Sequence, residues 1–71
     1  MEEKLLEIAS KVLKREISDI SLESLRSDIP TWDSFAHLAL VQTVEMQLGI
    51  EISIEDVAKI EKLADFFKYK M

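Results

Sequence analysis

Only one glycine and one proline interrupt this chain of 71 residues, which contains no cysteine. Without disulfides or thiolate metal sites, so short a chain depends on side-chain packing for its stability. Glycine and proline are the residues least suited to a helix interior, whereas Leu, Glu, Lys, Ile and Ala dominate here, and most of these favour helices. The sequence therefore predicts an all-α fold, and its length leaves room for one domain, residues 1–71.

Apolar residues recur at helical spacing in four segments of the chain. The first helix is expected at about residues 2–15. The second is expected at about 34–48 and ends at Gly49, because glycine adopts the left-handed conformation at low cost. A short third helix is expected at about 54–59, and a last one at about 61–69. This order of two long and two short helices predicts a small four-helix bundle.

The first two predicted helices are joined by a long connection, about residues 16–33, which is rich in Ser and Asp and contains Pro30. A structureless connection of this length is unusual in a compact domain and is often functional. Apolar residues punctuate the connection, so we expect it to pack against the helices. They are Ile17, Ile20, Leu22, Leu25 and Ile29.

Further local signals lie in the second half of the chain. The stretch 50–52 is expected to be extended. Ser53, with Asp56 three residues on, resembles a capping box in which aspartate replaces the usual glutamate or glutamine. The side chains of the last helix that are expected to face inward are Leu63, Phe66 and Phe67.

The chain is acidic, with a net charge of -5. Nucleic acid is not expected as a partner, since phosphate backbones attract clustered Lys and Arg. Five acidic residues against one arginine give residues 16–34 a charge of -4. Such a surface favours partners with basic patches, although solubility alone would also account for it. The charged residues of this stretch are Glu16, Asp19, Glu23, Asp28 and Asp33, against Arg26.

The N-terminus interleaves charged and apolar residues, so it lacks the uncharged core of a signal peptide. No apolar run approaches membrane-spanning length. We therefore expect a cytoplasmic, monomeric protein without a membrane span.

The second predicted helix has two apolar faces when its residues are placed at 100° intervals. Its core face gathers Leu40, Val41, Val44 and Leu48. A second face, on nearly the opposite side, consists of Phe35, Ala39, Gln42 and Met46. A small bundle cannot easily bury both sides, and an exposed apolar patch often marks a docking site, for which flexible methionine is well suited. We favour partner docking on this second face over coverage by the long connection or dimerisation.

The entry into the second helix resembles a known motif. Residues 30–38 read Pro-Thr-Trp-Asp-Ser-Phe-Ala-His-Leu and resemble the carrier-protein motif centred on Asp-Ser-Leu. Residues 48–52 resemble the segment that closes the second helix in acyl carrier proteins, and residues 55–60 resemble their third helix. The resemblance covers essentially the whole chain. The Trp-Asp-Ser form is similar to discrete acyl carrier proteins and to relatives of the D-alanine carrier proteins.

The resemblance implies a four-helix acyl-carrier-protein-like bundle that is not an enzyme. A phosphopantetheinyl transferase would attach 4'-phosphopantetheine covalently to Ser34, and Asp33 would contribute to recognition by that transferase. The thiol of the arm would hold an acyl or aminoacyl group as a thioester for loading and transfer enzymes. Such a serine must be exposed where a loop enters a helix, and its phosphate would then lie near free N–H groups at the positive end of the helix dipole. No metal site is expected.

The same residues also have structural interpretations. A serine before an apolar helical run is commonly an N-cap, and if Ser34 carries an arm, Asp33 is free to take over that role. We favour Trp32 as a packing anchor of the loop over a contact with cargo. His37 lies near the core face and has no nucleophile or carboxylate partner in motif spacing, so we assign it no catalysis.

The second helix departs from the pattern of fatty-acid carriers, whose docking face is rich in carboxylates. Between Ser34 and Gly49 only Glu45 is acidic, which enlarges the apolar part of recognition. We therefore expect partners from a dedicated biosynthetic pathway. The alternative is an unmodified helical interaction module with the same fold. An enzyme is disfavoured because the sequence shows no nucleophile–base pair, metal-ligand cluster or glycine-rich phosphate loop.

Overall fold

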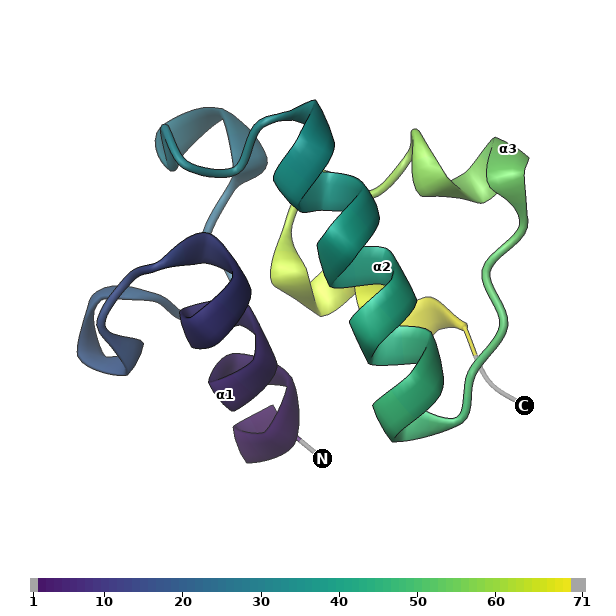
Figure 1. The fold of residues 1–71 in the computed structure, drawn as a ribbon, viewed down its shortest axis with the longest axis horizontal. Helices are drawn as coiled ribbons and strands as arrows, with labels where there is room; N and C mark the ends of the chain where they lie inside the picture. Colours follow the sequence, from purple (N-terminus) through teal and green to yellow (C-terminus); the bar gives the residue numbers. More distant parts are fainter. Residues whose placement is uncertain (1, 70–71) are drawn as a thin grey trace.

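The computed structural model describes residues 2–69, and helices form most of its regular structure (Figure 1). The α-helices are α1 (Glu2–Leu13), α2 (Ser34–Leu48) and α3 (Ile54–Val57). Three 3-10 helices complete the described part: η1 (Ile17–Asp19), η2 (Arg26–Asp28) and η3 (Leu63–Lys68). Helices α1 and α2 pack against each other, with the long loop at one end. The predicted all-α bundle is confirmed.

Helix α1 ends at Leu13, two residues before the predicted end. Lys14 adopts the left-handed conformation, with φ of 58°, and the N–H of Arg15 donates to the carbonyl of Ser10 at 3.1 Å. This bond across the left-handed residue closes the helix as a Schellman motif. The prediction was wrong at this end because Lys14 occupies a position where glycine is the usual signal.

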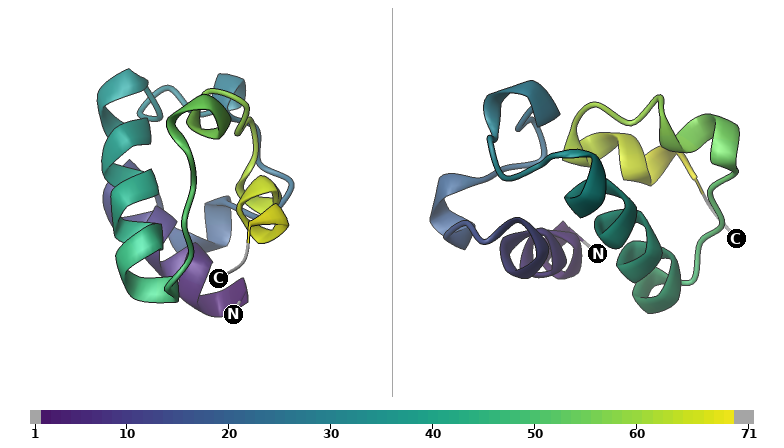
Figure 2. Two further views of the ribbon diagram at one scale, coloured as in Figure 1. Left: turned by 90° about the vertical axis from the view of Figure 1, so that its right-hand side faces the viewer. Right: turned by 45° about the horizontal axis from the view of Figure 1, so that its top comes forward.

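Helix α2 has the predicted bounds. It ends at Gly49, which is left-handed with φ of 68°, and the Gly49 N–H donates to the carbonyl of Glu45 at 3.0 Å. The chain then runs back along α2 toward α3 as extended backbone (Figure 2). The Glu45 carboxylate accepts a hydrogen bond from the Ile52 N–H at 2.8 Å, which holds this stretch beside the helix. Ile50 and Ile52 are buried.

Helix α3 is shorter than predicted. The Ser53 hydroxyl caps it by accepting from the Asp56 N–H. The Asp56 carboxylate binds that same hydroxyl at 3.0 Å rather than completing a capping box. A turn in which the Lys59 N–H donates to the Asp56 carbonyl at 3.0 Å follows the helix and leads into Ile60, which is buried. The predicted end at residue 59 was wrong because the chain turns to bring Ile60 into the core.

The last predicted helix is the 3-10 helix η3, and it begins two residues later than expected. Lys62 is extended because it forms an isolated antiparallel bridge with Leu25, so the helix begins only at Leu63. As expected, Leu63 and Phe66 are buried, and Phe67 is partly buried.

The buried carboxylate of Asp65 organises the start of η3. It accepts hydrogen bonds from the N–H groups of Glu61 and Lys62 at 2.9 and 3.2 Å, and it pairs with Lys68 at 3.4 Å. Burial alone would raise the pKa of Asp65. The two N–H donors and Lys68 outweigh that effect, so the pKa lies below its ordinary value.

The long loop is attached to the C-terminal segment by backbone hydrogen bonds. The Arg26 N–H donates to the Glu61 carbonyl at 2.7 Å, and the Ala64 N–H donates to the Leu22 carbonyl at 2.8 Å. At its other end the Thr31 hydroxyl donates to the carbonyl of Leu13, the last residue of α1. The expected packing of the loop is confirmed for its most buried side chains, Ile20 and Ile29, whereas Leu22 is partly buried and Ile17 and Leu25 are more exposed.

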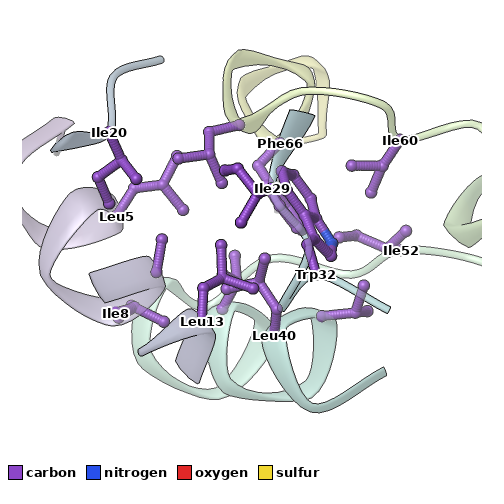
Figure 3. Close-up of a cluster of buried hydrophobic side chains, with 14 of the residues drawn as sticks. Leu5, Ile8, Leu13, Ile20, Ile29, Trp32, Leu40, Ile52, Ile60 and Phe66 are labelled. Carbon is purple, nitrogen blue, oxygen red and sulfur yellow. The ribbon is translucent and has the colours of Figure 1, made fainter. Parts of the chain in front are cut away.

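The long loop, α1, α2, η3 and the extended stretches on either side of α3 contribute to one core (Figure 3). The loop supplies Trp32 with Ile20 and Ile29, and these lie among side chains of α1, α2 and η3. The other members are Leu5, Ile8, Ala9, Leu13, Leu40, Val41, Val44, Ile50, Ile52, Ile60, Leu63 and Phe66. Among the helices of residues 2–69, none is both long enough and apolar enough to cross a membrane.

Candidate functional site

Ser34 is the first residue of α2, and its side chain is exposed. The preceding residue, Asp33, is the N-cap, and its carboxylate accepts a hydrogen bond from the Ala36 N–H at 2.8 Å. None of the side-chain hydrogen bonds found within residues 2–69 involves the Ser34 hydroxyl. The structural interpretation of Ser34 as the cap is therefore wrong, and the expected capping by Asp33 is confirmed.

The start of α2 retains backbone donors. Asp33 takes the Ala36 N–H with its side chain and the His37 N–H with its carbonyl, at 2.8 Å in each case. The N–H groups of Ser34 and Phe35 have no partner within the helix, as expected for its first turn. Donors of this kind, at the positive end of the helix dipole, suit the oxygens of a phosphate group attached to the Ser34 hydroxyl.

Trp32 is a packing residue, as expected, with only 2% of its surface exposed. Its indole Nε1–H donates to Nδ1 of His37 at 2.9 Å, and the two ring centroids lie 5.9 Å apart. The other ring nitrogen of His37, Nε2, lies 2.7 Å from the carbonyl oxygen of Val57. Both ring nitrogens of His37 therefore have a hydrogen-bond partner. Trp32 thus fixes the loop directly before Ser34.

The second apolar face of α2 is exposed. Phe35 and Met46 have 87% and 83% of their surfaces accessible, and Ala39 and Gln42 are exposed between them. The long loop does not cover this face, since its buried side chains enter the core instead. The opposite face is the core face, as predicted, with Leu40, Val41 and Val44 buried and Leu48 partly buried.

Two exposed apolar residues were missed by the sequence analysis. Leu38 is 56% exposed, and at 100° per residue it lies 60° from Phe35, at the edge of the second face. The helical wheel could therefore have identified it. Ile54, the first residue of α3, is 89% exposed and follows no periodic signal in so short a helix.

A groove of about 440 Å³ lies between the long loop and the segment after α3. Leu25, Arg26 and Trp32 line it from the loop, and Ala58, Ile60 and Glu61 line it from the other side. Sequence reasoning did not find this groove, because its walls are more than 25 residues apart in the chain. The Leu25–Lys62 bridge brings them together.

Comparison with known proteins finds one similarity that bears on function. No protein-family model matches the chain. A protein named acyl carrier protein, from Rickettsia bellii (strain RML369-C), is 25% identical over 69 residues, which cover 97% of this chain and 80% of that protein. The chain is therefore similar to an acyl carrier protein over nearly its whole length, and this similarity supports a carrier function in general terms.

Proposed function

We propose that this chain is a carrier protein that holds an acyl or aminoacyl group as a thioester on a 4'-phosphopantetheine arm attached to Ser34. The observation that supports the proposal most directly is the exposed Ser34 hydroxyl at the start of α2, left free because Asp33 caps the helix. The similarity to the Rickettsia bellii acyl carrier protein supports it independently. The 4'-phosphopantetheine arm would supply the thiol, which a chain without cysteine does not have.

In this proposal each residue near Ser34 has a separate task. Ser34 would provide the oxygen that forms the new bond to phosphorus. The pyrophosphate bond of coenzyme A would break, adenosine 3',5'-bisphosphate would leave, and the transferase would take up the hydroxyl proton. The first-turn N–H groups of Ser34 and Phe35 stabilise the phosphate. Asp33 keeps the helix start ordered and contributes to recognition by the transferase. Trp32, which is buried, holds the preceding loop in place so that the hydroxyl is presented at a fixed position.

We expect the unmodified chain, incubated with a phosphopantetheinyl transferase of broad specificity, Mg²⁺ and coenzyme A, to gain the mass of one phosphopantetheine. Intact-protein mass spectrometry measures this directly, and peptide mapping should place the added mass on Ser34. An established carrier protein, treated in parallel, controls for transferase activity. A chain that stays unmodified while the control protein gains the arm would contradict the proposal. The unmodified interaction module would then be the better interpretation.

The exposed face of α2 is the proposed docking surface for the partner enzymes. It comprises Phe35, Ala39, Gln42 and Met46, and no carboxylate belongs to it. Glu45, the acidic residue of α2, already bonds to the Ile52 N–H. We therefore propose that partners recognise this surface mainly through apolar contact, as in a dedicated pathway rather than general fatty-acid synthesis.

Met46→Glu is expected to lower kcat/KM for transferase modification at least about tenfold, because a carboxylate pressed against an apolar groove loses hydration, and a loss of only about 1.4 kcal/mol already corresponds to that factor. The matched control is Gln47→Glu, which adds the same charge at the next residue. Gln47 lies beside Lys4 and Lys11 of α1, away from the proposed surface. Its kcat/KM should change less than twofold. Equal losses in the two variants would mean that charge alone matters and would refute the apolar docking surface.

A further inference from the structure

The imidazole of His37 joins two segments that are far apart in the chain. It is buried, with 3% of its surface exposed, and each ring nitrogen has one partner. An indole N–H can only donate, so Nδ1 of His37 must accept from Trp32 and carries no proton. The proton of the neutral ring is therefore on Nε2, which donates to the Val57 carbonyl at 2.7 Å. Only the neutral ring satisfies both partners.

One partner of His37 lines a wall of the groove, and the other directly precedes a residue of the opposite wall. Trp32 itself lines the groove from the loop side, and Ala58, the residue after Val57, lines it from the α3 side. A doubly protonated ring presents an N–H at Nδ1 to the indole N–H of Trp32, and two donors then face each other inside the core. The loop before Ser34 and the end of α3 can both hydrogen-bond to His37 only while Nδ1 lacks a proton.

We propose that His37 is a pH-sensitive latch whose neutral ring holds the loop before Ser34 against the end of α3, and whose protonation releases Trp32 and opens the groove between them. The proposal does not rest on the proposed carrier function, because all of its parts belong to the unmodified chain.

The charges near the ring favour the neutral, closed form. Burial lowers the pKa of His37 below its ordinary value, and the positive charge of Arg26 in the loop acts in the same direction, while the bond to Val57 opposes them. Asp33, in the preceding turn, is bonded to the Ala36 N–H. On the α3 side Asp56 pairs with Lys59 at 3.6 Å. Within residues 2–69 no carboxylate forms an ion pair with His37.

The direction of the pH effect follows from this shift. Between the folded-state pKa and the unfolded value of about 6.5, the unfolded chain binds a proton that the folded chain does not. The stability supplied by the latch is therefore complete above about pH 6.5 and is lost as the pH falls through the folded-state pKa of His37. His37 is the only histidine in the chain, so a transition in this window has one side chain as its source.

The test follows His37 and Trp32 together between pH 7.5 and 5. Imidazole ¹⁵N shifts report the tautomer and protonation of His37, and exchange of the indole N–H with solvent reports the bond to Trp32. The matched variant is His37→Gln, whose amide offers an acceptor and a donor but does not titrate. At each pH, the exchange rate of the indole N–H in the natural chain is divided by the rate in His37→Gln. We expect this ratio to rise about tenfold as His37 is protonated. A constant ratio through the His37 titration would overturn the latch.

Trp32→Phe provides a second test, which holds even if His37→Gln fails to fold. Removing the indole N–H leaves Nδ1 free to accept a proton, so the pKa of His37 should move upward, toward its ordinary value. The same ¹⁵N titration measures it. An unchanged or lower pKa in Trp32→Phe would show that the two rings are not coupled and would overturn the proposal.

Discussion

Ser34→Ala is expected to abolish modification by a phosphopantetheinyl transferase completely, while the folded structure keeps its stability. The hydroxyl is the only atom group lost, and it is the proposed point of attachment. The stability should change by less than about 0.5 kcal/mol, since the residue is exposed and Asp33, not Ser34, caps α2. Intact mass after incubation with coenzyme A and thermal denaturation of the same sample measure the two effects.

The matched control is Ser53→Ala, at the start of α3. Ser53 is also an exposed serine directly involved in a helix start, but its hydroxyl does cap, accepting from the Asp56 N–H. This variant should lose about 0.5–2 kcal/mol of stability and still be modified on Ser34. Ser34→Ala should therefore lose modification and keep its stability, whereas Ser53→Ala should lose stability and still be modified. Modification of Ser34→Ala, or a loss of modification in a folded Ser53→Ala, would contradict the assignment of the arm to Ser34.

Helix α2 and the site at its start could be predicted because their signals are local. Gly49 directly follows Leu48, the last apolar residue of the helix, and Asp33 and Ser34 are consecutive residues of the motif. The two faces of α2 also follow from its periodicity alone, and the structure exposes the face with Phe35 and Met46. A local sequence pattern is enough for a correct prediction where a single helix sets both its own bounds and which of its side chains are exposed.

Other features of the structure depend on contacts between distant segments, which no local pattern records. The start of η3 is delayed because Lys62 pairs with Leu25, a residue of the long loop. The role of His37 depends on Val57, 20 residues away, and was visible in the sequence only as a polar residue on the core face. The groove lined by Trp32 and Ala58 also forms between segments that are distant in the chain. Pairings of this kind join the long loop to the C-terminal segment, and no pattern within either segment specifies them.

Phe66→Ala is expected to cost about 3–5 kcal/mol of folding free energy, the usual range for removing a fully buried phenylalanine. Phe66 is 1% exposed and lies in the cluster where the loop, both long helices and η3 meet (Figure 3). At about 0.05–0.15 kcal/mol per residue, a domain of this length has roughly 4–11 kcal/mol in total. The melting temperature should therefore fall by about 15 °C or more, as measured by circular dichroism.

Phe35→Ala makes the same chemical change where the ring is 87% exposed, and so separates burial from the loss of an aromatic residue. Its stability should stay within about 0.5 kcal/mol of that of the natural chain. The chain has no cysteine and therefore no disulfide, so its stability depends on side-chain packing. The difference in folding free energy between the two variants then measures the contribution of the core. If Phe66→Ala melted within a few degrees of Phe35→Ala, η3 would not be part of the cooperative core. The loop residue Leu22, whose carbonyl accepts from the Ala64 N–H of η3, would then be held by η3 only weakly.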